Sequence, residues 1–361
     1  EPILERRCVV CHGCYDAPCQ LKLGAWDGIA RGASKASVYE SSRIKAADPT
    51  RLFVDANRPS AWRKLGFFPV LNEREQTAEA NLAASVLYRS LELKRTHPLP
   101  DESLLPASFD FSLNRKQTCP TIEEYDHYAQ KFPLGGMPYG LPGLGTDEHD
   151  TITDWLQAGS PYEGPVPASA EALAAIASWE QFLNGDSLKE RLMSRYLYEH
   201  LFLGHLYFES DPLRQAYRIV RSAAPPGQPL DLIASRRPYD DPGVARPYYR
   251  LRPEGETILA KTHMPYELSP ARMNQYRRWF LEADYRVDSL PSYKPTSASN
   301  PFVSFKNIPA GSRYEFLLDE AQFFVMNFIK GPVCRGQLAL NVIEDHFWVF
   351  FIEPDTVSYT H

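Results

Sequence analysis

The chain has 361 residues, 43% of them hydrophobic and 23% charged, a composition that excludes disordered and collagen-like proteins and fits a globular protein of two domains. Its 39 Lys and Arg residues are scattered among 45 Asp and Glu residues, and the formal charge of −6 excludes the basic surface of a nucleic-acid-binding protein. A run of about 18 apolar residues is absent, so the sequence contains no predicted membrane-spanning helix.

Four of the six cysteines lie within the first 19 residues, and two of them belong to the pattern CVVCH at residues 8–12. This is the CxxCH pattern of c-type heme attachment, in which two thiols add to the porphyrin vinyl groups and the histidine binds the iron. The spacing of Cys8 and Cys11 lets both sulfurs reach one porphyrin edge. We therefore predict one covalent heme c with His12 as the proximal iron ligand. The alternative is a closed zinc site that uses Cys8, Cys11, Cys14 and Cys19.

The segment that follows contains a predicted helix over residues 75–94, which we expect to be a packing scaffold. Attached heme would place the chain in an oxidising compartment, so one disulfide is expected among Cys14, Cys19 and Cys119. The sequence leaves the pairing open, and Cys334 is a further candidate partner. Thr121 and Glu124 form a capping box that predicts a short helix after this segment.

A second iron ligand is predicted in the Met137-Pro138 segment, which precedes a helix that Thr146 can cap. One face of that helix is apolar and consists of Ile152, Trp155 and Leu156. The arrangement resembles the distal half of a class I cytochrome c, in which a Met-Pro loop places a thioether on the iron. The resemblance implies that Met137 is the distal ligand. It also implies a class I cytochrome c-like heme domain over residues 1–163, with a large insertion at about 20–120.

Met264 competes with Met137 for the role of distal ligand. The string Met-Pro-Tyr at 264–266 repeats the one at 137–139 and also precedes a predicted helix, from Ser269 through Trp279. The other interpretation of Met264 is a loop methionine packed in the core. We favour Met137, because the helix that follows it is closer to the cytochrome pattern.

The second half of the chain is predicted to contain long amphipathic helices, over residues 169–183, 187–208 and 312–330. Capping boxes begin the second and third of these, at Ser187 and at Ser312. A domain boundary is placed near residue 163, and residues 164–361 are expected to form an α-rich domain with minor β structure, incomplete as it stands. The predicted fold class is therefore mainly α.

Three groups of residues in this half have both a structural and a functional interpretation. His200 and His205 do not share a helix face, whereas His205 and Glu209 could share a ligand but more often form a packed pair. Arginines in a proline-rich stretch fit a solvated hairpin or contacts to phosphate or heme propionate: Arg236, Arg237, Arg246, Arg250 and Arg252. Aromatic residues near the end of the sequence fit core packing or the lining of an acyl-chain tunnel: Phe323, Phe324, Phe328, Phe347, Trp348, Phe350 and Phe351.

The cysteine-rich string from Arg6 to Leu21 resembles the periplasmic fatty acid cis/trans isomerases of Gram-negative bacteria. The resemblance continues through residues 24–26, 61–63 and 66–71, and through 196–202 and 313–316. Members of that family are longer than this chain, which has only seven residues before Cys8 and is therefore expected to be partial.

This family resemblance implies a heme c enzyme that converts cis double bonds in the acyl chains of membrane phospholipids to trans and so adapts membrane fluidity to stress. It implies a periplasmic enzyme, peripheral to the membrane, with Cys8, Cys11 and His12 at the matching heme motif. Side-chain contacts alone are insufficient to accelerate rotation about a carbon–carbon double bond. Rotation about an amide bond, which is only partly double, already faces a barrier of about 18–20 kcal/mol, and the barrier for a full double bond is far higher. The alternative function is a periplasmic electron-transfer cytochrome fused to a partner-binding domain.

Overall fold

The computed structural model describes residues 2–13, 17–37, 39–40, 43–44, 50–101, 105, 109, 116–259, 262–321 and 323–324. By their internal contacts the residues divide into two compact units, Glu1–Val166 and Pro167–His361. Each unit has its own buried hydrophobic clusters.

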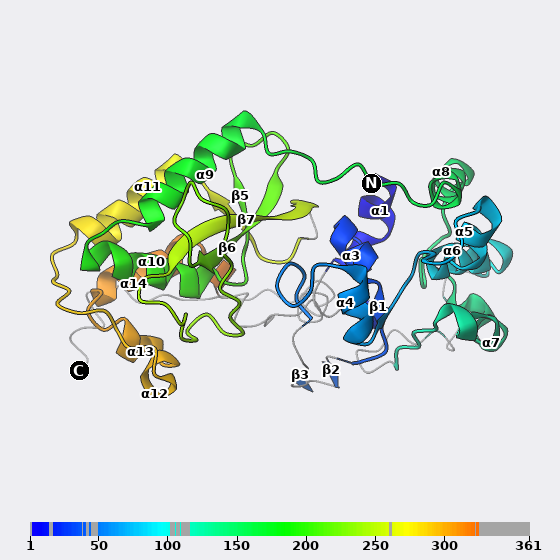
Figure 1. Ribbon diagram of the computed structural model, residues 1–361, viewed down its shortest axis with the longest axis horizontal. Helices are drawn as coiled ribbons and strands as arrows, with labels where there is room; N and C mark the ends of the chain where they lie inside the picture. The colour runs from blue at the N-terminus through cyan, green and yellow to red at the C-terminus, as the bar shows by residue number, and fades with distance from the viewer. Residues whose placement is uncertain are drawn as a thin grey trace. The chain divides into compact units, whose positions relative to one another are not determined.

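Short helices and two small antiparallel ladders make up the first half of the first unit (Figure 1). Strand β1 (Ala33–Ser34) pairs with β4 (Phe67–Phe68), and β2 (Tyr39–Glu40) pairs with β3 (Arg43–Ile44). The helical elements here are α1 (Pro2–Arg7), α2 (Val9–His12), η1 (Pro18–Gln20), α3 (Trp26–Arg31) and α4 (Pro59–Lys64).

The predicted helix over 75–94 is divided in the structure into α5 (Ala78–Ala83) and α6 (Val86–Thr96). Ser85 separates the two, because its Oγ accepts a hydrogen bond from the N–H of Tyr88 and donates one to the carbonyl of Val70. A serine in this position begins a new helix rather than continuing the old one. The remaining elements of the unit are η2 (Ile122–Glu124), α7 (Tyr125–Lys131), η3 (Pro133–Gly135) and α8 (Thr146–Gln157).

One of the two helix starts predicted in this region is confirmed, and the other is displaced by one residue. The N–H of Thr121 donates to Glu124 Oε2 at 3.0 Å, where the capping box predicts η2. Helix α8 begins at Thr146, with Gly145 rather than Thr146 in the N-cap position. Its predicted apolar face is confirmed, since Ile152 and Leu156 are buried and Trp155 packs beside them.

Two hydrophobic clusters hold the first unit together, and both contain residues that were expected to lie in an insertion. One joins Leu23 and Ile29 to Val70, Val86 and Leu93. The other joins Leu87 and Leu91 of α6 to Ile152 and Leu156 of α8, with Ile3 and Leu4 packed against them. The segment at 20–120 is thus part of the core of the unit. The prediction of a class I cytochrome c-like domain with an inserted scaffold is wrong.

A disulfide joins Cys19 to Cys119, with 5.7 Å between their Cα atoms. It confirms the prediction of one disulfide among the three candidate cysteines and shows its pairing. The bond closes a segment of 100 residues, so it ties the two ends of the scaffold region together. Cys14 and Cys334 lie outside the described residues.

A four-stranded mixed sheet is the centre of the second unit, with the strand order β7-β6-β5-β8. Strand β5 runs parallel to β8, and the other two pairings are antiparallel. Alternate residues of β7 are buried through its first half, as expected of a strand with one face on a core. The strands are β5 (His205–Phe208), β6 (Gln215–Ser222), β7 (Tyr248–Thr257) and β8 (Pro265–Leu268).

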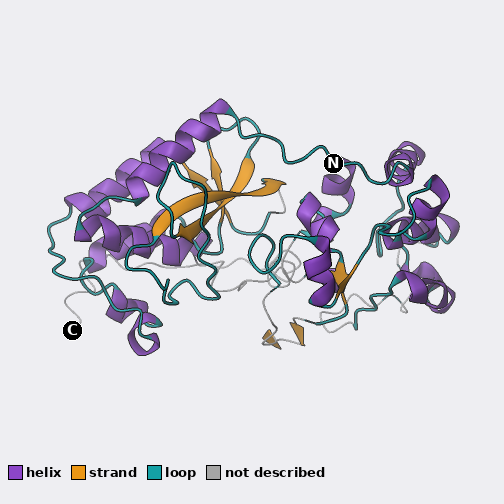
Figure 2. Cartoon of the chain, viewed as in Figure 1, coloured by secondary structure: helices purple, strands orange, loops and turns teal. Residues whose placement is uncertain are grey.

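Helices pack against this sheet, α9 on β7 and α10 on β6 (Figures 1 and 2). Ser169, Ser187 and Ser269 cap α9, α10 and α11, each accepting a hydrogen bond from a backbone N–H three residues on. An aromatic core that includes Tyr276 and Phe316 fills the space between helices and sheet. The helices are α9 (Ala170–Leu183), α10 (Leu188–Leu201), α11 (Pro270–Tyr276), the π-helical η4 (Arg277–Glu282), α12 (Pro295–Ala298), α13 (Pro301–Ser304) and α14 (Ala310–Asp319).

The mainly α prediction is also wrong for this unit. The predicted helix over 187–208 ends at Leu201, because residues 205–208 pair with both β6 and β8 as a sheet strand. Backbone pairing with distant segments overrides the helical spacing there. The helix predicted over 312–330 is observed from Ala310 to Asp319. Phe328, Phe347, Trp348, Phe350 and Phe351 lie outside the described residues.

Candidate functional site

The thiols of the CxxCH motif lie at a short helix, α2, for which Cys8 is the N-cap. The N–H groups of Cys11 and His12 donate to the carbonyl of Cys8, at 3.1 and 2.9 Å, and this single turn fixes the spacing of the motif. Cys8 and Cys11 are both present as thiols rather than in a disulfide. Burial raises the pKa of Cys8 to about 11, so this thiol is protonated at neutral pH.

His12 is buried and held in one orientation. Its Nδ1–H donates to the carbonyl of Leu21 at 2.9 Å, and its own carbonyl accepts from the N–H of Leu23. Burial lowers the pKa of the imidazole, which favours its neutral form. A neutral ring with a proton on Nδ1 carries its lone pair on Nε2, the arrangement found in metal-binding histidines.

Met137 lies in the same unit as His12, after η3, and its side chain is half-buried. Its N–H donates to the carbonyl of Ser90 in α6 at 2.9 Å, which anchors the loop to that helix. Met264 instead lies in the hydrophobic core of the second unit, next to β8, and is 6% exposed. The packing of Met264 matches the core interpretation, and Met137 stays the predicted distal ligand.

Lys94 is a residue that the sequence analysis missed. It lies in α6 with 2% of its surface exposed, and its Nζ has no hydrogen-bond partner among the described residues. Its backbone is so close to Gly136 that a Cβ on that glycine would meet Lys94 N at 2.3 Å, so the lysine lies directly beside the Met137 loop. Burial lowers the pKa of this ammonium. A buried cation without a partner is costly, which makes the site suited to an anionic group. The only signal in the sequence is that Lys94 follows the apolar positions Leu87 and Leu91 on the same helix face.

Zinc is a poor fit to these residues. Cys19 is bonded to Cys119, so it cannot complete the four-cysteine site that Cys8 and Cys11 would require. Among the residues that the structure describes, no group of three or more His, Cys, Asp or Glu side chains is arranged to hold a metal ion. A covalent heme fits better, because two thiols, a neutral imidazole and a buried cation suited to a propionate lie in one unit.

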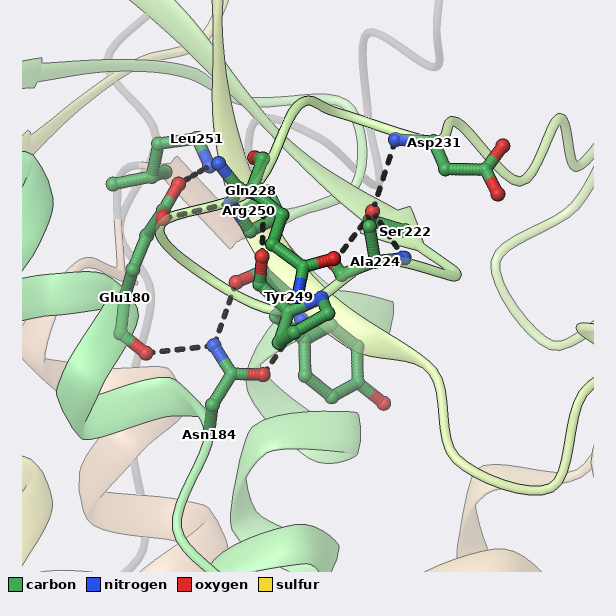
Figure 3. Close-up of polar contacts among 10 residues, drawn as sticks. Glu180, Asn184, Ser222, Ala224, Gln228, Asp231, Tyr249, Arg250 and Leu251 are labelled. Carbon is green, nitrogen blue, oxygen red and sulfur yellow. Dashed lines mark hydrogen bonds and ion pairs between the residues drawn. The ribbon is translucent and has the colours of Figure 1, made fainter.

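The arginines of the proline-rich stretch mostly form ion pairs. The carboxylate of Glu180 in α9 accepts hydrogen bonds from Arg250 Nε at 2.7 Å and from the N–H of Leu251 at 2.8 Å. Figure 3 shows this network joining the end of α9 to β7. The other pairs are Arg252 with Glu254, Arg246 with Asp186 and Arg237 with Asp240. These contacts support the structural interpretation of those arginines over the phosphate-binding one.

His205 and His200 are also parts of the second unit's interior. The Nδ1–H of His205 donates to the carbonyl of His263 at 2.5 Å, and Arg218 donates to its Nε2 at 3.1 Å. The Nδ1–H of His200 donates to the carbonyl of Tyr196, and its ring contacts Phe305 and Phe316. Both histidines are therefore engaged in packing and hydrogen bonds within the unit.

Comparison with known proteins identifies a family. A family model described as "Fatty acid cis/trans isomerase (CTI)" matches residues 47–361, which is most of the chain and covers the second unit and the first unit from residue 47 onward. Neither a curated protein nor a solved structure matches. A search of the described helices finds none with the length and apolar character to cross a bilayer.

Proposed function

The chain belongs to the fatty acid cis/trans isomerase family, and from that premise we propose that it performs this isomerisation with one covalently attached heme c. The family match makes it an isomerase that acts on the fatty acyl chains of lipids. The observation that carries the heme proposal is the CxxCH helix. There the hydrogen bond from His12 to Leu21 leaves the lone pair of the imidazole on Nε2, as in metal-binding histidines, and this supports the proposal.

Each residue of the motif has a separate task in this proposal. Cys8 and Cys11 would anchor the porphyrin, His12 would bind the iron through Nε2, and Met137 would be the distal ligand. When bound, a ferric heme supplies an electron acceptor that can lower the bond order of an alkene and then return the electron density. Lys94 would pair with a propionate, which accounts for its buried ammonium. The buried surroundings of His12 keep the imidazole neutral, as iron binding requires.

We further propose that the enzyme is periplasmic, lies at the membrane surface and acts on phospholipid acyl chains to adapt membrane fluidity to stress. The Cys19–Cys119 disulfide supports this location, since such bonds persist in oxidising compartments. It also agrees with heme attachment through the thiols of Cys8 and Cys11, which takes place in the same kind of compartment.

The test is acyl-chain analysis of vesicles that contain cis-unsaturated phospholipid, incubated with heme-loaded protein. We expect trans product from wild type and none from His12→Ala at matched heme content. His127→Ala is the control, because His127 is exposed on α7 of the same unit. Trans product from His12→Ala at the wild-type rate would overturn the heme proposal. A His/Met heme spectrum without any trans product from wild type would favour an electron-transfer cytochrome.

A further inference from the structure

The second unit contains a cavity of about 150 Å³ between the end of α9, helix α10, the start of β7 and the loop at 290–293. Its polar lining is strongly basic and aromatic, with Arg191, Arg195, Arg246, Tyr249 and Tyr293. The volume is sufficient for a carboxylate or a phosphate group with a few waters. None of the heme-motif residues lies in this unit.

Buried charge around the cavity is out of balance. Arg195 is 3% exposed and Arg221 is 1% exposed, and both interact with Glu199. Arg195 Nε donates to Glu199 Oε1 at 2.7 Å. Arg221 Nη2 donates to Ser235 Oγ, whereas its Nε and Nη1 have no hydrogen bonds among the described residues. Two guanidinium groups thus share one carboxylate. An excess positive charge in a buried setting favours binding of an anion.

Arg191 adds a third positive charge at the same place. It lies one helical turn before Arg195 on α10, so both side chains project from one helix face. Its side chain is half-buried, and the structure gives it neither an ion pair nor a side-chain hydrogen bond among the described residues. Arg246, in contrast, is held by Asp186 Oδ1 at 2.6 Å and by the carbonyl of Asn184. Arg191 is therefore the cation of the lining that is available to a ligand.

The walls of the cavity are fixed before any ligand arrives. Asn184 accepts from the N–H of Tyr249 at 2.9 Å and donates to its carbonyl at 2.8 Å, which ties α9 to β7 (Figure 3). The guanidinium of Arg195 lies 3.8 Å from the ring centroid of Tyr293 and donates to the carbonyl of Pro291. A site that is already ordered loses little conformational entropy on binding, which favours affinity.

We propose that this cavity binds one oxyanion, contacted by Arg191 and stabilised by the buried charges of Arg195 and Arg221, and that the oxyanion is the head of the acyl lipid substrate. The identity of the ligand rests on the proposed function, whereas the presence of an anion site does not. The oxyanion is the phosphate diester of a phospholipid or the carboxylate of a free fatty acid. In either form Arg191 is a positioning residue for the substrate, remote from the bond that rotates.

The experiment is calorimetric titration of the whole chain with three probes that lack long acyl chains: glycerophosphocholine, hexanoate and inorganic phosphate. Arg191→Gln removes the contacting charge without breaking an existing contact, and Arg278→Gln removes an exposed arginine of the same unit as the control. We expect Arg191→Gln to raise the Kd about tenfold, which is typical of losing one hydrogen bond to a charged group. Arg278→Gln should leave the Kd unchanged.

The probes separate the sources of the oxyanion. Binding of glycerophosphocholine alone identifies a phospholipid head, and binding of hexanoate alone identifies a free fatty acid. Binding of inorganic phosphate alone would overturn the assignment to lipid, and no binding, or equal Kd values for wild type and Arg191→Gln, would overturn the site itself. Titration needs neither heme nor turnover, so its outcome is independent of the His12→Ala experiment.

In turnover assays Arg191→Gln should raise KM about tenfold at unchanged kcat, which a general loss of stability would not do.

Discussion

Buried charges of the two units differ in their partners. In the first unit Lys94 is buried beside the Met137 loop, and its ammonium group has no partner among the described residues. In the second unit Arg250 is paired with Glu180 and Arg195 with Glu199, in both cases away from solvent. The second unit thus pairs these cations with its own carboxylates, although Arg221 keeps two donors without hydrogen bonds among the described residues. The unpaired ammonium of Lys94 supports the proposal that the first unit holds an anionic group that the polypeptide does not itself supply.

The largest stability effect is expected from breaking a pair in the second unit, with Glu180→Gln. The variant removes the negative charge that faces Arg250, and it turns an amide NH2 toward one of the two donors that now bind the carboxylate, Arg250 Nε or the N–H of Leu251 (Figure 3). Because the pair is 14% and 6% exposed, the remaining buried guanidinium should cost about 3 kcal/mol of the free energy of unfolding. Urea unfolding measures this cost.

The control for that change is Glu171→Gln, because Glu171 is an exposed residue of the same helix, α9. It should change the free energy of unfolding by less than about 0.5 kcal/mol. Equal effects of the two variants would show that the Glu180–Arg250 pair contributes no more than a surface charge.

In the first unit, Lys94→Met is expected to raise the free energy of unfolding, whereas Glu180→Gln lowers it. Without heme, removing a buried ammonium that has no partner should stabilise the chain by about 1–2 kcal/mol at neutral pH. With heme attached, the same change removes the proposed propionate partner, so the gain should shrink or reverse. Urea unfolding of the heme-free and heme-loaded forms measures both values. Lys131→Met, an exposed change on α7, is the control and should have little effect in either form.

An identical gain for Lys94→Met in both forms would mean that the lysine does not face the heme. The unpaired ammonium of Lys94 would then reflect only how the first unit is packed, and not a bound group. A loss of stability in the heme-free form would mean that Lys94 has a partner inside the polypeptide. The buried charge of the first unit would then be paired like those of Arg195 and Arg250 in the second unit.

The sequence predicted the parts of this molecule that depend on neighbouring residues. The helical turn of the CxxCH motif, the helix starts at Ser169, Ser187 and Ser269 and the apolar face of α8 are local patterns, and each follows from the spacing of a few side chains. The end of α10 could not be predicted in this way, because residues 205–208 become a strand only through pairing with residues 11 and 60 positions away. The resemblance of the Met137 segment to a cytochrome likewise led to a wrong fold, since the cores draw on residues between the two predicted ligands.

The candidate sites show the same division. Cys8, Cys11 and His12 are close in sequence and were proposed from it, whereas Lys94 and Arg191 acquire their significance only from burial and from the lack of partners among the described residues. Nothing in the sequence separates Arg191 from Arg246, which has an acidic partner in the structure. Charge balance in a folded interior depends on distant residues, so it cannot be predicted from spacing.

The smallest expected effect concerns the buried histidine of the second unit, His200. Burial lowers its pKa to about 4, and its ring lies among Tyr196, Phe305 and Phe316. Between pH 6.5 and 4 the unfolded chain binds a proton at this residue that the folded chain does not, so stability decreases as the pH falls through this range. Through this proton His200 lowers the free energy of unfolding by about 1 kcal/mol near pH 6.

His200→Phe suits the aromatic surroundings and should remove that part of the pH dependence, measured as the free energy of unfolding at pH 7.5 and pH 6. His97→Phe, at an exposed position in the first unit, should leave the dependence as it is. A pH dependence unchanged by His200→Phe would show that the acid sensitivity comes from other groups, such as His12, whose pKa burial also lowers.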